Sequence, residues 1–129
     1  MEARGRLYFT IVKEEKHFPV AYEGDFLGII RMDSIDSNNR SVRVGLDIDP
    51  NQRGQGFGSL AFKALLSFCF DHWNQHRVWL CVLEDNKIAK KMYDNLGFKE
   101  EGRYRESIFR NGKYVDYIVM SILESEYHK

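Results

Sequence analysis

Apolar and polar residues alternate in short runs along the first half of the chain. Apolar runs typical of β-strands lie at residues 7–12, 18–22 and 26–32. Charged turns are predicted between these runs, at residues 13–16 and 23–25, and the polar loop 33–39 follows them. Because the connections are short, the pattern predicts antiparallel pairing of neighbouring strands.

A stricter alternation follows over residues 41–49. One face of this predicted strand carries the apolar side chains Val42, Val44, Leu46 and Ile48, and the other carries Arg43, Gly45, Asp47 and Asp49. We therefore expect one face of the strand in the core and the other face free for function.

The second half of the chain changes to helical spacing. Residues 57 to about 73 predict a helix of some four turns, with a buried face made of Phe57, Leu60, Ala61, Ala64, Leu65, Phe68, Cys69 and His72. Residues 77–83 are rich in Val, Leu and Trp and predict a buried strand. A strand, a helix and a second strand in this order imply parallel pairing through a right-handed crossover.

A second helix and a long hairpin complete the chain. The helix is predicted to begin at Asp85 or Asn86 and to end at Leu96, where Gly97 provides a C-terminal stop. Residues 98–109 and 113–123 predict a hairpin that turns at Asn111-Gly112. The whole order predicts a mixed α/β sheet.

Length and composition point to one compact domain over residues 1–129. The chain is 43% hydrophobic and 14% aromatic, which is enough to build a core. Lys and Arg together number 19, as do Asp and Glu, so the formal net charge is zero. This balance gives no electrostatic reason to expect nucleic acid or an anionic membrane as a partner.

The cysteines and the N-terminal residues bear on the location of the protein. Cys69 and Cys81 lie in apolar stretches without the spacing of a zinc site or a redox pair, so we expect buried, reduced thiols and no metal. The apolar run at 7–12 is too short to span a bilayer, and no cleavage site of a secretory signal precedes it. A cytoplasmic location is predicted.

The segment 49–58 is rich in glycine and joins a predicted strand to a predicted helix. Gly54, Gly56 and Gly58 allow the backbone to approach an anion at the positive end of the helix, and Arg53 adds a charged donor. This composition favours a phosphate site, although a plain loop has similar residues. The segment 56–61 also fits the G-x-G-x-x-A fingerprint of a dinucleotide fold, with Glu84 as the ribose-binding acid, but the chain does not repeat the βαβ unit.

Four motifs in order together resemble the GNAT superfamily of N-acetyltransferases. They are Arg53-Gly54-Gln55-Gly56-Phe57-Gly58, Asn86 to Tyr93, Leu96-Gly97-Phe98 to Arg103, and Asn111-Gly112 to Asp116. The similarity covers about residues 7–123 and is greatest to the branch with spermidine, ribosomal-protein alanine and amino-sugar acetyltransferases. It implies a mixed, mostly antiparallel sheet of about six to seven strands with two main helices. The strand and two helices that usually precede this part in the family are expected to be absent.

The resemblance implies acetyl-coenzyme A as the donor of an acetyl group to a primary amine, by direct attack in a ternary complex. The diphosphate would be bound by the main chain of Arg53, Gly54, Gln55, Gly56, Phe57, Gly58 and Ser59. The pantetheine arm would be bound by the main chain of Leu46, Asp47 and Ile48, in an opening between two splayed strands. Asn86 matches the family asparagine that binds the coenzyme, and Tyr93 matches its tyrosine near the thioester sulfur.

Each of these two residues also has a purely structural interpretation. Asn86 is placed to cap the second helix, and Tyr93 is placed to pack on its apolar face. We expect Tyr93 to be the catalytic acid that assists the departing thiolate.

The catalytic base departs from the family pattern. Relatives often carry a glutamate where this chain has Arg43, and an arginine cannot accept a proton at physiological pH. Asp47 is the substitute that we assign, with Glu84 or a chain of waters as alternatives. Arg43 could instead bind an acidic group of the acceptor.

Three further expectations concern the acceptor, the oligomeric state and the alternative function. A small amine or a peptide N-terminus is the expected acceptor, because Glu100, Glu101 and Glu106 favour a cation, although neighbouring basic residues offset their charge. The family analogy suggests a homodimer through an exposed sheet edge. The competing functional class is a module that binds acyl-coenzyme A without turnover.

Overall fold

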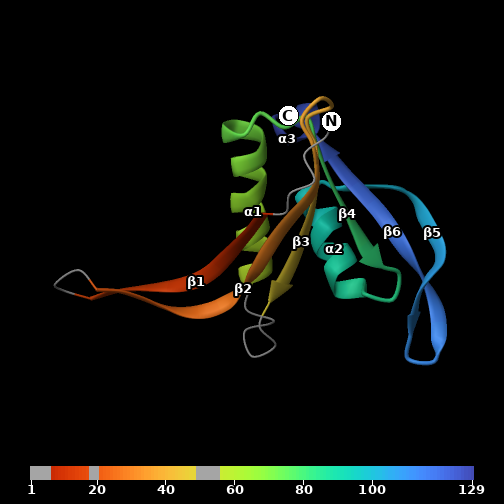
Figure 1. Cartoon of the computed structure of the whole chain (residues 1–129), viewed down its shortest axis with the longest axis horizontal. Helices are drawn as coiled ribbons and strands as arrows, with labels where there is room; N and C mark the ends of the chain where they lie inside the picture. The colour runs from red at the N-terminus through yellow and green to blue at the C-terminus, as the bar shows by residue number, and fades with distance from the viewer. Residues whose placement is uncertain (1–6, 18–20, 49–55) are drawn as a thin grey trace.

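The fold is a six-stranded sheet with helices packed on it (Figure 1). The computed structural model describes residues 7–17, 21–48 and 56–129, with side chains for 28–47 and 56–129. The elements in chain order are β1 (Leu7–His17), β2 (Ala21–Asp36), β3 (Ser41–Ile48), α1 (Phe57–Ser67), η2 (Phe68–His72), β4 (Arg77–Leu83), α2 (Lys87–Leu96), β5 (Lys99–Arg110), β6 (Lys113–Leu123) and α3 (Glu124–Tyr127). The strand order is β1-β2-β3-β4-β6-β5.

The first two strands form one long hairpin rather than three short segments. Lys13 lies opposite Asp25, Glu14 opposite Gly24, and Glu15 opposite Glu23. The two charged turns expected at 13–16 and 23–25 are therefore wrong, because both segments are paired strand. The hairpin extends away from the rest of the sheet (Figure 1), and charged residues are compatible with a strand pair outside the core.

The central pair of strands is parallel, as the order strand, helix, strand predicts. Ser41 lies opposite Arg77, and Arg43 lies opposite Trp79. All other strand pairs are antiparallel. A dinucleotide fold would need repeated parallel units, so the fold contradicts that alternative.

The first helix begins where expected, and its buried face is shifted by about one residue, since Ala61, Leu65 and Cys69 are buried as expected. Its buried residues are Ala61, Phe62, Leu65 and Leu66, continued by Cys69 and Phe70 in the π-helical segment η2. Leu60, Ala64 and Phe68 of the expected stripe are exposed, as is His72. Two apolar stripes, one residue apart, have the same period, and packing against α2 selects the one that contains Phe62.

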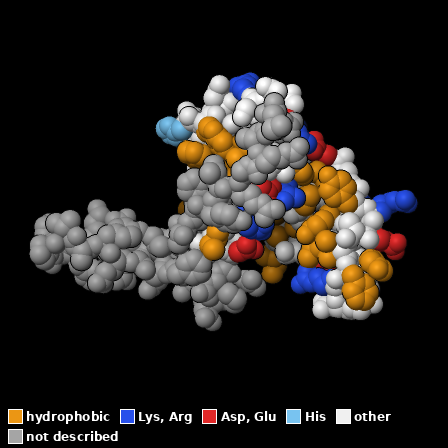
Figure 2. All heavy atoms as spheres, viewed as in Figure 1, with side chains coloured by type: hydrophobic (Ala, Val, Ile, Leu, Met, Phe, Trp, Pro, Cys, Tyr) orange, Lys and Arg blue, Asp and Glu red, His pale blue; other side chains and the backbone are white. Residues whose placement is uncertain are grey.

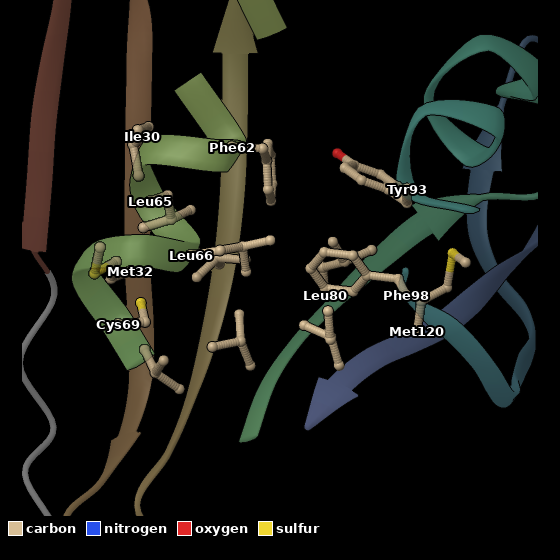
Figure 3. Packing of buried hydrophobic residues seen from close by; sticks show 14 of the residues in the cluster. Ile30, Met32, Phe62, Leu65, Leu66, Cys69, Leu80, Tyr93, Phe98 and Met120 are labelled. Carbon is tan, nitrogen blue, oxygen red and sulfur yellow. The ribbon is translucent and has the colours of Figure 1, made fainter. Parts of the chain in front are cut away.

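The second helix has the caps that its sequence predicts. The Asn86 side chain accepts a hydrogen bond from the Ala89 amide at 3.2 Å, and Gly97 ends the helix with φ 99°. Phe62 of α1 and Tyr93 of α2 are in ring contact, with centroids 5.1 Å apart. Both helices therefore pack on the same face of the sheet, over a core that includes Met32, Leu80 and Met120 (Figure 3).

Two further observations concern the described part of the chain. Within it, no helix has the length and apolar character needed to cross a bilayer. Cys69 and Cys81 are free thiols; Cys69 is buried as expected, and Cys81 is only partly buried. The cytoplasmic location and the extent of the domain, residues 1–129, stay predictions.

Candidate functional site

The strands β3 and β4 separate after a short parallel stretch. Their pairing runs only from Ser41 to Arg43 on β3. On its other side β3 stays paired with β2 as far as Ile48, opposite Gly28. Over residues 44–48, including Leu46 and Asp47, the edge of β3 that faces β4 therefore has no strand partner among the described residues. A polar, extended ligand can add to such an edge as an extra strand would.

In the sequence, α1 follows β3 after a short connection. Gly56 is the N-cap, with φ 81° in the left-handed region, and it makes no side-chain cap. The first intrahelical bond runs from the Leu60 amide to the Gly56 carbonyl at 3.2 Å. The amides of Phe57, Gly58 and Ser59 have no acceptor inside the helix, which suits an anion. Arg53, Gly54 and Gln55 lie outside the described residues.

Asn86 has the capping role that the sequence predicts, and its coenzyme-binding role stays a prediction. Its side-chain carbonyl oxygen caps α2, and the residue is exposed. An asparagine side chain also has an amide group with two donors. The capping bond therefore fixes the side chain and leaves these donors for a ligand.

Tyr93 lies in the core, on the face of α2 that packs against α1. Its side chain is 8% exposed and contacts the rings of Phe62 and Phe98, with centroids 5.1 and 5.8 Å away. The hydroxyl points away from α2, toward the side of Phe62 (Figure 3). Burial raises the pKa of Tyr93 to about 12, with a smaller contribution from the charge of Asp47. The phenol is therefore neutral at physiological pH and can donate a hydrogen bond.

Asp47 lies on the exposed face of β3. Its side chain is 67% exposed and accepts a hydrogen bond from Nε of Arg31 at 3.0 Å. The Arg31 guanidinium extends over Gly45, where an added Cβ would lie 2.8 Å from it. The bond to Arg31 uses Oδ2 of Asp47. The role of Asp47 as the base stays a prediction from the sequence.

Arg43 is engaged within the protein. Its Nε and Nη2 donate to the two Asp33 oxygens at 2.6 and 2.9 Å, and this hydrogen bonding raises the pKa of Arg43. The guanidinium lies 5.8 Å from the Trp79 ring, as does that of Arg77. With two donors bound to Asp33, Arg43 is poorly placed to bind an acidic acceptor group.

Arg43 and Asp33 line a groove on the face of the sheet opposite α1 and α2, whereas Asp47, Asn86 and Tyr93 are not among its lining residues. The groove has a volume of about 770 Å³, and its walls include Asp33, Arg43, Arg77, Trp79 and Glu101. Each arginine among them has a carboxylate partner, since Arg77 pairs with Glu101. In the view of Figure 2, positive and negative side chains are likewise mixed, without a large patch of one sign.

Glu84, the alternative base, is also engaged. One of its oxygens accepts from the Asp116 amide at 3.1 Å, and the other accepts from Arg103 at 3.0 Å. Sequence reasoning missed the roles of Asp33 and Asp116, because both pairings depend on strand register. The alternation of β4 could have placed Trp79 on the face opposite the core.

The cysteines provide no activated nucleophile in the described part of the chain. Burial raises the pKa of the Cys69 thiol to about 12. Burial also raises the pKa of Cys81, although the charge of Arg43 opposes this effect. A thiol in this state is a weak nucleophile at neutral pH, which disfavours an acyl-enzyme.

Comparisons with known proteins agree with this arrangement. The sequence profile of the acetyltransferase (GNAT) family matches residues 2–98. A spermidine N(1)-acetyltransferase of Vibrio cholerae is 33% identical over 80% of this chain and 60% of its own length. A putative ribosomal N-acetyltransferase, YdaF of Bacillus subtilis, is 28% identical over 82% of this chain and 58% of its own length.

A solved structure has the same fold. The crystal structure of spermidine N-acetyltransferase from Vibrio cholerae in complex with CoA and spermine superposes with a TM-score of 0.79 at 32% identity. The match covers 82% of this chain and 63% of that one. The chain thus spans about three fifths of the length of these relatives.

Proposed function

The chain belongs to the acetyltransferase (GNAT) family, and we propose on this premise that it transfers an acetyl group from acetyl-coenzyme A to a primary amine. The observation that carries the proposal is the separation of β3 from β4 after Arg43, which leaves the β3 edge at 44–48 without a described strand partner, on a strand whose Asp47 charge acts on the Tyr93 phenol. The amine nitrogen attacks the thioester carbonyl carbon directly, the carbon–sulfur bond breaks, and coenzyme A leaves as a thiol.

Three groups of residues bind the donor in this proposal. The amides of Phe57, Gly58 and Ser59 bind the diphosphate, together with the preceding segment 53–56. The β3 edge at Leu46, Asp47 and Ile48 binds the pantetheine arm, and an amide there polarises the thioester carbonyl. The Asn86 side-chain amide adds a donor at the start of α2. The left-handed Gly56 supports this assignment, because a residue with a Cβ is strained at φ 81°.

Tyr93 acts on the departing sulfur. A thiol has a pKa of about 8.5, so complete proton transfer from a phenol of pKa about 12 is uphill by about 5 kcal/mol. A neutral phenol in a dry site is instead suited to donate a hydrogen bond to the developing thiolate. The proton that completes the thiol then comes from the nitrogen of the attacking amine.

The amine needs a base or a site that favours its neutral form. A primary amine with a pKa near 10 is mostly protonated at pH 7, and its deprotonation costs about 4 kcal/mol. Asp47 is our candidate for this base, since it lies on β3 within the same strand that binds the pantetheine arm. Arg43 and Glu84 are excluded from the role by charge and by their internal hydrogen bonds, respectively.

The acceptor is proposed only as a class. The relatives include spermidine N(1)-acetyltransferases, and the similar Vibrio cholerae structure is a complex with CoA and spermine. A polyamine is therefore the first acceptor to test, and peptide N-termini are the second. A homodimer in the cytoplasm remains part of the proposal.

Thiol release provides the test. Purified protein is incubated with acetyl-coenzyme A and a panel of polyamines, amino acids and peptides, and free thiol is measured over time. We expect release that depends on one acceptor class, and tight calorimetric binding of coenzyme A. Binding without release by any amine would favour a non-catalytic module, and no binding of coenzyme A would reject the proposal.

A further inference from the structure

Asp116 belongs to a motif of the sequence that the proposed chemistry does not use. It lies on β6 beside the end of β4, and its side chain is 21% exposed. Its main chain accepts from the Glu84 amide at 3.1 Å, and its amide donates to the Glu84 side chain at 3.1 Å. Asp116 and Glu84 are thus bound to each other twice.

The Asp116 side chain also holds an irregular part of β5. The pairing of β5 with β6 is interrupted between Tyr104 and Ile108. Inside this bulge Glu106 has φ 48°, in the left-handed region that a residue with a Cβ rarely adopts. The Glu106 amide donates to Asp116 Oδ1 at 2.8 Å, which compensates for this conformation.

Arg103 completes the cluster from β5. Its Nη1 lies 3.0 Å from Glu84 Oε2 and 3.4 Å from Asp116 Oδ2. Hydrogen bonding to Asp116, and then to Glu84, raises the pKa of Arg103. The hairpin is linked to the same turn a second time, because Arg110 and Asp85 are 3.8 Å apart. In Figure 1 the hairpin runs along the side of the molecule where β4 ends.

The turn that this cluster holds leads directly into the proposed site. Glu84 and Asp85 are followed by Asn86, whose amide donates to the Leu83 carbonyl at 2.9 Å. Tyr93 is seven residues further on, where it is held independently by Phe62 and Phe98. A shift of the turn therefore displaces Asn86 more than Tyr93.

We infer that Asp116 is a positioning residue, which together with Glu84 and Arg103 fixes Asn86 for the coenzyme. This inference rests on the proposed function. Asp116 acts through the β4–α2 turn and touches neither substrate. Its loss therefore weakens coenzyme binding while the chemical step is retained.

Kinetics and calorimetry of the Asp116→Asn and Arg103→Gln variants test the inference. We expect the KM for acetyl-coenzyme A and the Kd for coenzyme A to rise about fivefold in each, with kcat within about twofold of wild type. Arg105→Gln is the matched control, because Arg105 is exposed on the same strand and has no ion pair with any described residue. This control should leave all three constants unchanged.

A purely structural role gives a different result. If these variants lower the melting temperature and the amount of active protein while KM and Kd stay within about twofold of wild type, the inference is overturned. Glu84→Gln serves as a third variant if one of the two does not fold. If the wild-type protein fails to bind coenzyme A, the proposed function is rejected as well. If the wild type binds coenzyme A and the variants bind it equally well, only this inference is rejected.

Discussion

The two faces of the sheet are built from alternate residues of the same strands. On β4, Val78, Leu80 and Val82 are at most 4% exposed beneath the helices. Trp79, between them on the opposite face, lies beside two arginines. The first face holds Tyr93 in an apolar environment, and the second carries carboxylate–arginine pairs around a groove. The stability of the fold and the position of Tyr93 therefore depend on the face covered by the helices. Substitutions on the grooved face should have less effect on folding.

The largest effect is expected from a cavity under the helices. Phe62 is fully buried against Tyr93 and Phe98, so Phe62→Ala should lower the free energy of unfolding by about 3–5 kcal/mol. Phe109 is 64% exposed, and Phe109→Ala should cost less than about 1 kcal/mol. Urea denaturation of both variants measures the difference. Equal losses of unfolding free energy in the two variants would show that the covered face does not contribute more to stability than the exposed surface.

Alkaline pH provides the next test of the covered face. The folded pKa of Tyr93 is about 12, above its unfolded value near 10. The unfolded chain therefore loses this proton first, and the stability that the group contributes below pH 10 is lost as pH rises toward 12. The contribution is up to about 3 kcal/mol. Urea denaturation at several pH values should show a smaller loss in Tyr93→Phe than in wild type, and identical pH dependence would contradict the burial of the phenol.

The same substitution separates catalysis from packing. Under the proposed function, Tyr93→Phe should lower kcat about tenfold to a hundredfold, because the hydrogen bond to the departing sulfur is lost. The Kd for coenzyme A should change less than about twofold, since the ring contacts remain. Steady-state kinetics with the best acceptor and calorimetry measure the two effects. An unchanged kcat would remove the role that we assign to the hydroxyl.

The smallest effect is expected on the grooved face. Arg43→Gln breaks the bond to Asp33. The Arg43 side chain is 39% exposed but that of Asp33 only 12%, so the loss in stability should be about 1–2 kcal/mol and smaller at high salt. Thermal melts at low and high ionic strength measure it. A loss as large as that of Phe62→Ala would show that the two faces contribute alike.

Much of the fold could be predicted from local signals. The parallel unit of β3, α1 and β4, the caps of α2 and the Asn-Gly hairpin agree with the structure, because caps and turns are read from neighbouring residues. The buried face of α1 was predicted only in part, because Phe62, Leu66 and Phe70 are buried there beside the expected Ala61, Leu65 and Cys69. Its sequence contains two stripes of equal period, and the Tyr93 contact decides between them.

Pairings between strands limited the prediction of the site. The resemblance led to Asn86 and Tyr93, and the structure gives both a defined environment. The bond between Arg43 and Asp33 depends on the register of β2 with β3, which composition does not specify. Asp116 was missed for the same reason, since its partners come from β4 and β5.

A crystal structure of the protein with coenzyme A tests the central claim most directly. We expect the pantetheine arm between β3 and β4 along residues 44–48, and the diphosphate within hydrogen-bond distance of the amides of Phe57, Gly58 and Ser59. The sulfur should lie near the Tyr93 hydroxyl. Coenzyme bound elsewhere, with this opening filled by the protein's own side chains, would contradict the account.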